Sequence, residues 1–299
     1  MENWLAALPK LELDVKLEDT RLGGRDVLLD GIESMSDPQV LNRQLMRDAD
    51  YYQLAHNWLL RCHAEGVVHV EPSIMPFAHS TLSFAAIMEA LTDAFESAEA
   101  NWGMTWRLSV AMHPEQVTDT QIRAAMAMAQ MHPWLGSITL ALTEHTQYSD
   151  FCKVITALSA APIPLRCAID SQPSIWQVNE RDRCWQLIRS DQGLSDALAP
   201  LQIESQWVGM SSAQIVQADS FDDFLFMGRG QAYLYSRSPD KQGSVTQQLR
   251  DATEKYRLSA YQIKQLACNA IAASMMTDEE KGKWQEVVLN DAWEFLGES

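Results

Sequence analysis

The sequence predicts an α/β protein, either a (β/α)8 barrel, also called a TIM barrel, or a doubly wound parallel sheet. Short apolar segments typical of buried strands alternate with longer amphipathic segments typical of helices along most of the 299 residues. The strand candidates number about eight, as a (β/α)8 barrel requires. No Gly-rich turn follows the first of them, which weakens the dinucleotide-binding form of the doubly wound sheet.

The first strand is predicted over residues 11–18, where every second residue is apolar. Asp14 and Lys16 are two residues apart, so their side chains point to the same face, and a central strand would bury both. Opposite charges on a buried face must pair with each other or serve a site. This strand is therefore the first place to look for function.

The other elements follow in order. Further strands are predicted at 67–71, ended by Pro72, and at 106–111, 137–142, 164–169, 184–188, 201–208 and 231–235, of which 184–188 is the most poorly defined. Helices are predicted at 38–63, 81–100, from Thr118 onward, at 148–160 and through the C-terminal third, ending with 278–296. Capping boxes mark three helix starts: Thr118 with Gln121, Ser259 with Gln262, and Thr277 with Glu280.

The length would suit one barrel or two smaller domains. The chain contains no internal repeat, low-complexity tract or Pro/Gly linker that would divide it. We therefore predict a single domain over residues 1–299.

The composition excludes several classes of protein. The net charge of −17 argues against nucleic acid as a routine partner, because phosphate binding needs clustered Lys and Arg. No apolar run approaches the length of a membrane span, and the N-terminus lacks a signal-peptide pattern. Five cysteines are scattered without paired spacing, which is typical of reduced thiols. We expect a cytoplasmic protein that does not bind membranes.

The first strand also carries a family resemblance. Residues 8–17 read Leu-Pro-Lys-Leu-Glu-Leu-Asp-Val-Lys-Leu and resemble the opening strand of the adenosine deaminase family, Leu-Pro-Lys-x-Glu-Leu-His-x-His-Leu. In that family the two histidines hold a catalytic zinc. Here Asp14 and Lys16 occupy the two histidine positions.

The resemblance extends from about Leu8 to Lys281. Further similar segments are 64–71, 138–144, 256–259, 265–274 and 280–281, in the same order and spacing as in the family. This implies a zinc-hydrolase type (β/α)8 barrel of the amidohydrolase superfamily, with C-terminal helices. The connections between the first strand and Val67 and between Asp170 and Glu204 are shorter than in the family, which implies a shortened lid.

The family's functional positions are changed on other strands too. The fifth strand ends in His-Ala-Gly-Glu in the family, but here residues 166–170 read Arg-Cys-Ala-Ile-Asp. The last strand ends in Thr-Asp-Asp-Pro in the family, but here residues 236–239 read Ser-Arg-Ser-Pro. No histidine follows His145, so the family's later catalytic histidine has no counterpart in register.

These changes predict a site without a metal. A catalytic zinc needs several nitrogen or oxygen ligands and an open water position. Lys16 and Arg237 would instead place two cations where the zinc would lie, paired with Asp14 and Asp170. We expect no metal, no cofactor and no catalytic residue. The degenerate site and its candidate ligand contacts comprise Asp14, Lys16, Arg166, Cys167, Asp170, Glu204, Arg237 and Ser238.

Cys167 and the histidines each allow a functional interpretation and a structural one. Cys167, at a strand end, could be a reactive thiol, but a buried and inert cysteine is the favoured interpretation. The seven histidines could include a metal cluster, although none has the family register, and solvated or hydrogen-bonded histidines are favoured. His56 and His63 lie seven residues apart on one predicted helix and could share a face.

Three functional hypotheses follow. The first is a pseudoenzyme, a structural or regulatory binding subunit with a protein partner or a homo-oligomeric assembly. The second is a nucleotide or nucleoside sensor, or a metal-independent hydrolase, in which Lys16, Arg166 and Arg237 hold a purine-like or anionic small molecule. The third, ranked last, is a conventional purine nucleoside or nucleotide deaminase with unrecognised ligands.

Overall fold

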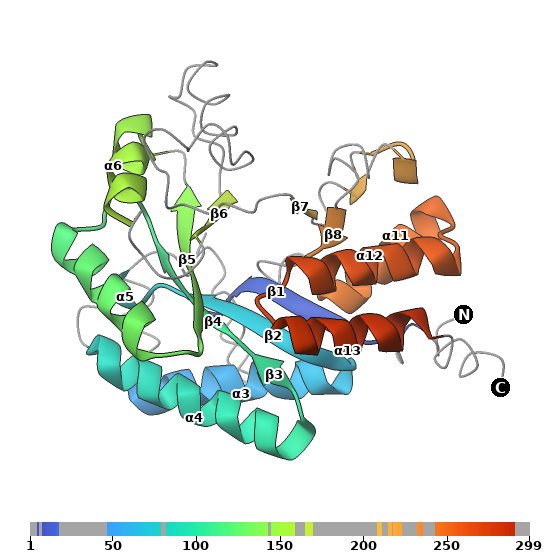
Figure 1. Cartoon of the computed structure of the whole chain (residues 1–299), viewed down its shortest axis with the longest axis horizontal. Helices are drawn as coiled ribbons and strands as arrows, with labels where there is room; N and C mark the ends of the chain where they lie inside the picture. The colour runs from blue at the N-terminus through green and yellow to red at the C-terminus, as the bar shows by residue number, and fades with distance from the viewer. Residues whose placement is uncertain are drawn as a thin grey trace, which may run out of the picture. The chain divides into compact units, whose positions relative to one another are not determined.

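A computed structural model of the chain describes residues 5, 8–17, 47–78, 82–142, 145–158, 165–169, 208–210, 215–216, 218–222, 232–235 and 243–290. Parallel strands and helices alternate along the chain, as predicted (Figure 1). By their contacts the residues form two compact units, one of residues 1–72, 78–107 and 207–299 and the other of residues 73–77 and 108–206. The units interleave along the chain, and the single domain predicted from the sequence stays a prediction.

The first unit contains three strands in its main sheet and five helices among its described residues. Strand β1 neighbours β2, and β2 pairs in parallel with β3 through His69 and Thr105. A separate parallel pair, β7 and β8, belongs to the same unit. The bounds are β1 Lys10–Lys16, α3 Asp48–Ala64, β2 Val67–Ile74, α4 Phe84–Trp102, β3 Thr105–Trp106, β7 Val208–Met210, β8 Ala232–Leu234, α11 Val245–Tyr256, α12 Ala260–Ala273 and α13 Asp278–Leu289.

The core of this unit forms around β1. Leu11 and Leu13 are fully buried in one apolar cluster with residues of β8, α11 and α12. The alternate residues of the strand, Lys10, Glu12 and Lys16, are buried as well. Strand β1 lies at the end of the described sheet, beside β2, yet its described side chains on both faces are buried, so its polar side chains must find partners inside the protein.

Helices α3 and α4 lie side by side in the same unit (Figure 1). The rings of Trp58 and Phe95 meet edge to face at 6.4 Å between centroids, and Phe95 stacks on Trp106 at 5.1 Å. Such ring pairs add to the stabilisation from apolar burial. They hold the two helices against β3.

The second unit is a parallel β-sheet with two helices. The end of β2 pairs with β4 through Ser73 and Ser109, β4 pairs with β5, and β5 pairs with β6. Each crossover between β4, β5 and β6 passes through a helix, as parallel neighbours require. The bounds are β4 Leu108–Met112, α5 Asp119–Met131, β5 Leu135–Leu142, α6 Tyr148–Leu158 and β6 Leu165–Ile169, and a short 3-10 helix, η2 Pro76–Ala78, follows β2.

Two predicted strand boundaries were wrong. Strand β2 runs through Pro72 to Ile74 instead of ending before the proline. Pro72 lies between the part of β2 that pairs with β3 and the part that pairs with β4, so its missing N–H interrupts neither ladder. The strand predicted at 106–111 is two strands, β3 and β4, separated by Arg107.

The predicted helix starts agree better with the structure. All three capping boxes are present, at Thr118, Ser259 and Thr277. Helix α3 is described from Asp48, and residues 38–46 of the predicted helix lie outside the described residues. The same holds for the strand predicted at 184–188, for most of 201–208, and for residues 18–46 and 170–207, so the shortened lid stays a prediction.

Within the described ranges, no helix has the length and apolar character needed to cross a membrane.

Candidate functional site

Lys16 is the best-defined residue of the predicted site. It is the last residue of β1 and only 2% of its surface is exposed. Asp14 lies in the same strand, two residues before Lys16, but its side chain is outside the described part of the protein. The burial of Lys16 is confirmed, whereas its pairing with Asp14 stays a prediction.

Of the other predicted site residues, only Arg166 has a described side chain. Arg166 lies on β6, is half-buried and is in register with Thr139 of β5. Cys167 follows it in β6, where only its backbone is described. The remaining four lie outside the described residues: Asp170, Glu204, Arg237 and Ser238.

A row of buried hydroxyl groups lies on the strands of the second unit. Ser137 Oγ donates to Ser109 Oγ over 2.9 Å, and Ser109 Oγ lies 2.6 Å from Thr139 Oγ1. Registered residues of parallel strands point to the same side, so Arg166 projects to the same side as Thr139. This side of the sheet joins hydroxyl groups with one guanidinium group, a combination suited to an anion.

The carboxyl ends of β4 and β5 hold a second polar group. His113 Nδ1 lies 3.0 Å from the carbonyl oxygen of Ala141, which requires Nδ1 to carry a proton. Glu115 Oε1 is 4.0 Å from the same nitrogen, and Thr146 Oγ1 donates to Glu115 Oε2 over 2.8 Å. Active sites of α/β barrels are built at this end of the strands, so this group is a further site candidate. The sequence patterns singled out neither Glu115 nor Thr146 as a site residue.

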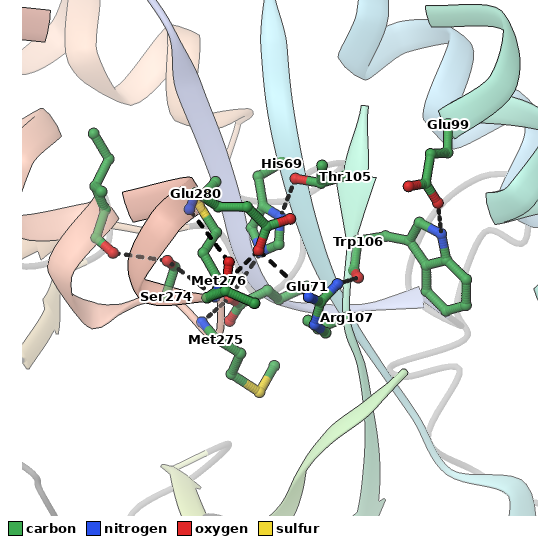
Figure 2. A network of polar contacts seen from close by, with 12 residues as sticks. His69, Glu71, Glu99, Thr105, Trp106, Arg107, Ser274, Met275, Met276 and Glu280 are labelled. Atoms are coloured by element: carbon green, nitrogen blue, oxygen red, sulfur yellow. Dashed lines mark hydrogen bonds and ion pairs between the residues drawn. The ribbon is translucent and has the colours of Figure 1, made fainter. Parts of the chain in front are cut away.

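The residues of β2 that precede its carboxyl end take part in a buried network of polar contacts (Figure 2). His69 and Glu71 are both fully buried, and His69 Nε2 lies 3.0 Å from Glu71 Oε1. His69 Nδ1 lies 2.8 Å from Thr105 Oγ1 on β3. The backbone N–H of Met275, in the connection between α12 and α13, also donates to Glu71 Oε1. The network thus joins β2, β3 and the start of α13.

A second contact reinforces this junction. Arg107 contacts Glu280 of α13 at 3.4 Å and donates to the carbonyl of Trp106 over 2.7 Å. Burial acts to raise the pKa of Glu280, but the hydrogen bonds from Thr277 and the charge of Arg107 outweigh it and lower the pKa. Glu280 is therefore ionised at neutral pH.

The position of this network indicates a structural role. His69 and Glu71 are the third and fifth of the eight residues of β2, before the carboxyl end where active sites of barrel folds are built. Their side chains have no exposed surface to offer to a substrate. We therefore assign the network to anchoring α13, and not to chemistry.

Among the described residues, the side chain of Lys16 does not fit a zinc ion of the family type. Lys16 presents an ammonium group, which donates hydrogen bonds and does not ligate zinc. Within the part of the chain that the structure describes, no three or more His, Cys, Asp or Glu side chains are arranged to hold a metal. His56 and His63 do share a face of α3, but both rings contact Trp102, at 6.2 and 5.0 Å between centroids.

Comparison with known proteins gives relatives of one kind. No protein-family profile matches the chain. An adenine deaminase from Hahella chejuensis is 23% identical over 95% of this chain and 96% of its own length. An adenine deaminase from Bordetella parapertussis is 27% identical over 129 residues, 35% of this chain. In that match the chain spans 41% of the relative's length.

Solved structures share the fold over nearly the whole chain. An amidohydrolase from Burkholderia ambifaria, solved with bound zinc, has a TM-score of 0.73 at 15% identity, covering 99% of this chain and 93% of that one. The Arabidopsis protein ADAL, solved with IMP, has a TM-score of 0.71 at 16% identity, covering 98% and 99%. The motifs, the sequence matches and the shared fold agree: the chain is a divergent relative of the adenosine deaminase family, with the α/β barrel fold of the amidohydrolases.

Proposed function

We propose that this protein is a catalytically inactive relative of the adenosine deaminases that acts as a structural or regulatory binding subunit. One observation carries the proposal: Lys16 lies buried on β1 at the position where the family places a zinc-binding histidine. The relatives include an adenine deaminase and an N6-methyl-AMP deaminase. The resemblance implies that this position holds a zinc ligand in the family.

The electrostatic reason is direct. A lysine ammonium group close to a dication would raise the energy of both, because two like charges repel strongly where water is excluded. The ammonium group is proposed to provide the positive charge that Asp14, predicted on the same face of the strand, would otherwise need from a metal. Arg237, at the end of the last predicted strand, is proposed to add a second cation.

The metal content of the purified protein tests the loss of the site. The chain is incubated with a slight excess of Zn²⁺, passed through a desalting column and measured by plasma mass spectrometry. We expect far less than one zinc per chain, and a Lys16→Met variant should behave in the same way. One tightly held zinc per chain in the unaltered protein would overturn the proposal.

The binding role predicts a companion. Affinity purification from the native host, with light scattering on the purified chain, should show either a stable protein partner or a homo-oligomer. The three described cysteines, Cys62, Cys152 and Cys268, form no disulfide, which supports our placement of this role in the cytoplasm. A chain that is monomeric and recovers no partner would leave the binding role without support.

A second candidate function is binding of an anionic small molecule. Arg166 favours it, because its guanidinium lies on the hydroxyl-bearing side of the second unit's sheet, in register with Thr139. A ligand that binds only the folded state raises the melting temperature. AMP or IMP should then stabilise the protein while adenosine does not, and Arg166→Gln should abolish the shift. Equal shifts with AMP and adenosine would contradict recognition of the phosphate.

A further inference from the structure

A polar cavity of about 140 Å³ lies within the first unit, and its lining includes none of the predicted site residues. Its wall includes Glu12 of β1, residues of α3 and the residue that caps α11. About 10–15 Å³ of such volume is enough to hold one water molecule, so a small ion and several waters would fit. The lining residues are Glu12, Trp58, Arg61, Cys62, Glu65 and Ser244.

Glu12 is held in one orientation at this cavity. Only 2% of its surface is exposed, and its Oε1 accepts a hydrogen bond of 3.0 Å from the backbone N–H of Val245. Val245 is the first residue of α11, so the positive end of the helix dipole faces the carboxylate. This contact leaves the second oxygen, Oε2, for the cavity.

Two carboxylate oxygens at the cavity have no hydrogen-bond donor. Glu12 Oε2 and Glu65 Oε2 are both buried, and neither finds a partner among the residues that the structure describes. A buried carboxylate oxygen without a donor is unfavourable, so a ligand that brings donors would be favoured. Lys10, on the same strand as Glu12, points its Nζ to the carbonyl oxygens of Leu5 and Leu8, at 2.8 Å each.

The arrangement favours a cation that carries its own hydrogen-bond donors. The described residues around Glu12 form no group that could hold a metal ion, which needs a close cage of ligands. An N–H cation needs only acceptors at hydrogen-bond distance, and such charge-assisted bonds to carboxylates are strong. We propose that this cavity binds a small ammonium ion or a primary ammonium group through the carboxylates of Glu12 and Glu65.

Binding should be linked to pH. Burial, together with the nearby Glu65, raises the pKa of Glu12 to about 8, while the N–H of Val245 and the charges of Arg61 and Lys10 oppose this shift. Cys62, which also faces Glu12, stays a thiol, because burial and the two carboxylates raise its pKa. A bound cation favours the ionised form of Glu12, so affinity should rise between pH 6 and pH 8.

Thermal unfolding of the full chain in different chloride salts tests the proposal. At equal ionic strength and pH 8, ammonium and methylammonium should raise the melting temperature by several degrees more than potassium or tetramethylammonium, which lack N–H donors. The difference should shrink at pH 6. Equal shifts with all four salts would show a general salt effect and overturn the proposal.

Two isosteric variants separate the site from general stability. Glu12→Gln and Glu65→Gln should each weaken ammonium binding at least tenfold, while the exposed control Glu254→Gln should leave it unchanged. If Glu12→Gln does not fold, by circular dichroism, Glu65→Gln decides the question alone. Unchanged ammonium binding in Glu65→Gln would contradict the assignment.

Discussion

The charged residues of β1 are the features on which this account depends. The sequence places Asp14 and Lys16 on one face of a strand, and their alternation with leucines predicts that a central strand buries them. The structure confirms burial for Lys10, Glu12 and Lys16. It could not be foreseen that Glu12 would accept a hydrogen bond from the start of α11, because Val245 lies 233 residues away in the chain.

The buried carboxylate of Glu12 makes stability depend on pH. Its pKa is about 8 in the folded chain against an ordinary value of 4.5, chiefly because of burial. Between these values the folded state binds more protons than the unfolded state, so the contribution of Glu12 to stability falls as pH rises. Relative to Glu12→Gln, the unaltered protein should lose stability from about pH 5 to pH 8, by at most about 1.4 kcal/mol per pH unit.

Urea unfolding at several pH values, in sodium buffers free of ammonium, measures this difference. The difference between the two proteins should level off above pH 8. A constant difference from pH 5 to pH 8 would show that Glu12 titrates in the folded chain as it does in the unfolded chain.

Glu71 is a second residue with a predictable energetic effect. Its Oε1 accepts from the N–H of Met275 and contacts the ring of His69, and the side chains of Glu71 and His69 have no access to water. Glu71→Ala should lower the free energy of unfolding by about 3 kcal/mol, because the buried His69 and the half-buried N–H of Met275 would lose their acceptor. Chemical denaturation checks this. Lys153→Ala, which breaks an ion pair exposed on both sides, should cost less than about 1 kcal/mol.

At the scale of elements, local patterns predicted helix starts better than strand ends. A capping box is a contact between residues three apart, so the sequence contains all of it. The extent of β2 and the break at Arg107 depend instead on which strand lies alongside. Pro72 could not be recognised as an internal residue, since the change of partner from β3 to β4 is invisible in the sequence.

Removing the capping box of α13 tests how strongly the cap stabilises the start of this helix. Thr277 accepts from the N–H of Glu280, and the Glu280 side chain returns to the N–H of Thr277 over 2.7 Å. Thr277→Ala should destabilise the protein by about 1 kcal/mol. It should also speed hydrogen exchange in the first turn of α13, because the N–H of Glu280 would lose its acceptor, the hydroxyl of Thr277. Thr277→Ser, which keeps the hydroxyl, should exchange like the unaltered protein; equal exchange in the alanine variant would contradict the role of the cap.

At the scale of the whole molecule, the fold was more accessible than the site. Alternating strands and helices, together with motifs from residue 8 to residue 281, predicted the barrel that the comparisons confirm. The site was less accessible because its residues come from separate strand ends, whose mutual distances no local pattern encodes. Lys16 and Arg166 are placed by the structure, whereas Asp170, Glu204, Arg237 and Ser238 lie outside its described residues and stay predictions.

Deamination is the activity that the replacement of the zinc ligands should have removed. The ultraviolet absorbance of adenine, adenosine and AMP, followed separately with the purified chain and added Zn²⁺, measures it most directly. We predict no change above the rate without protein for any of the three, also with Lys16→Met as a comparison. Steady turnover of one of them by the unaltered chain, stopped by a chelator, would contradict the central claim that a lysine has taken the place of a zinc ligand.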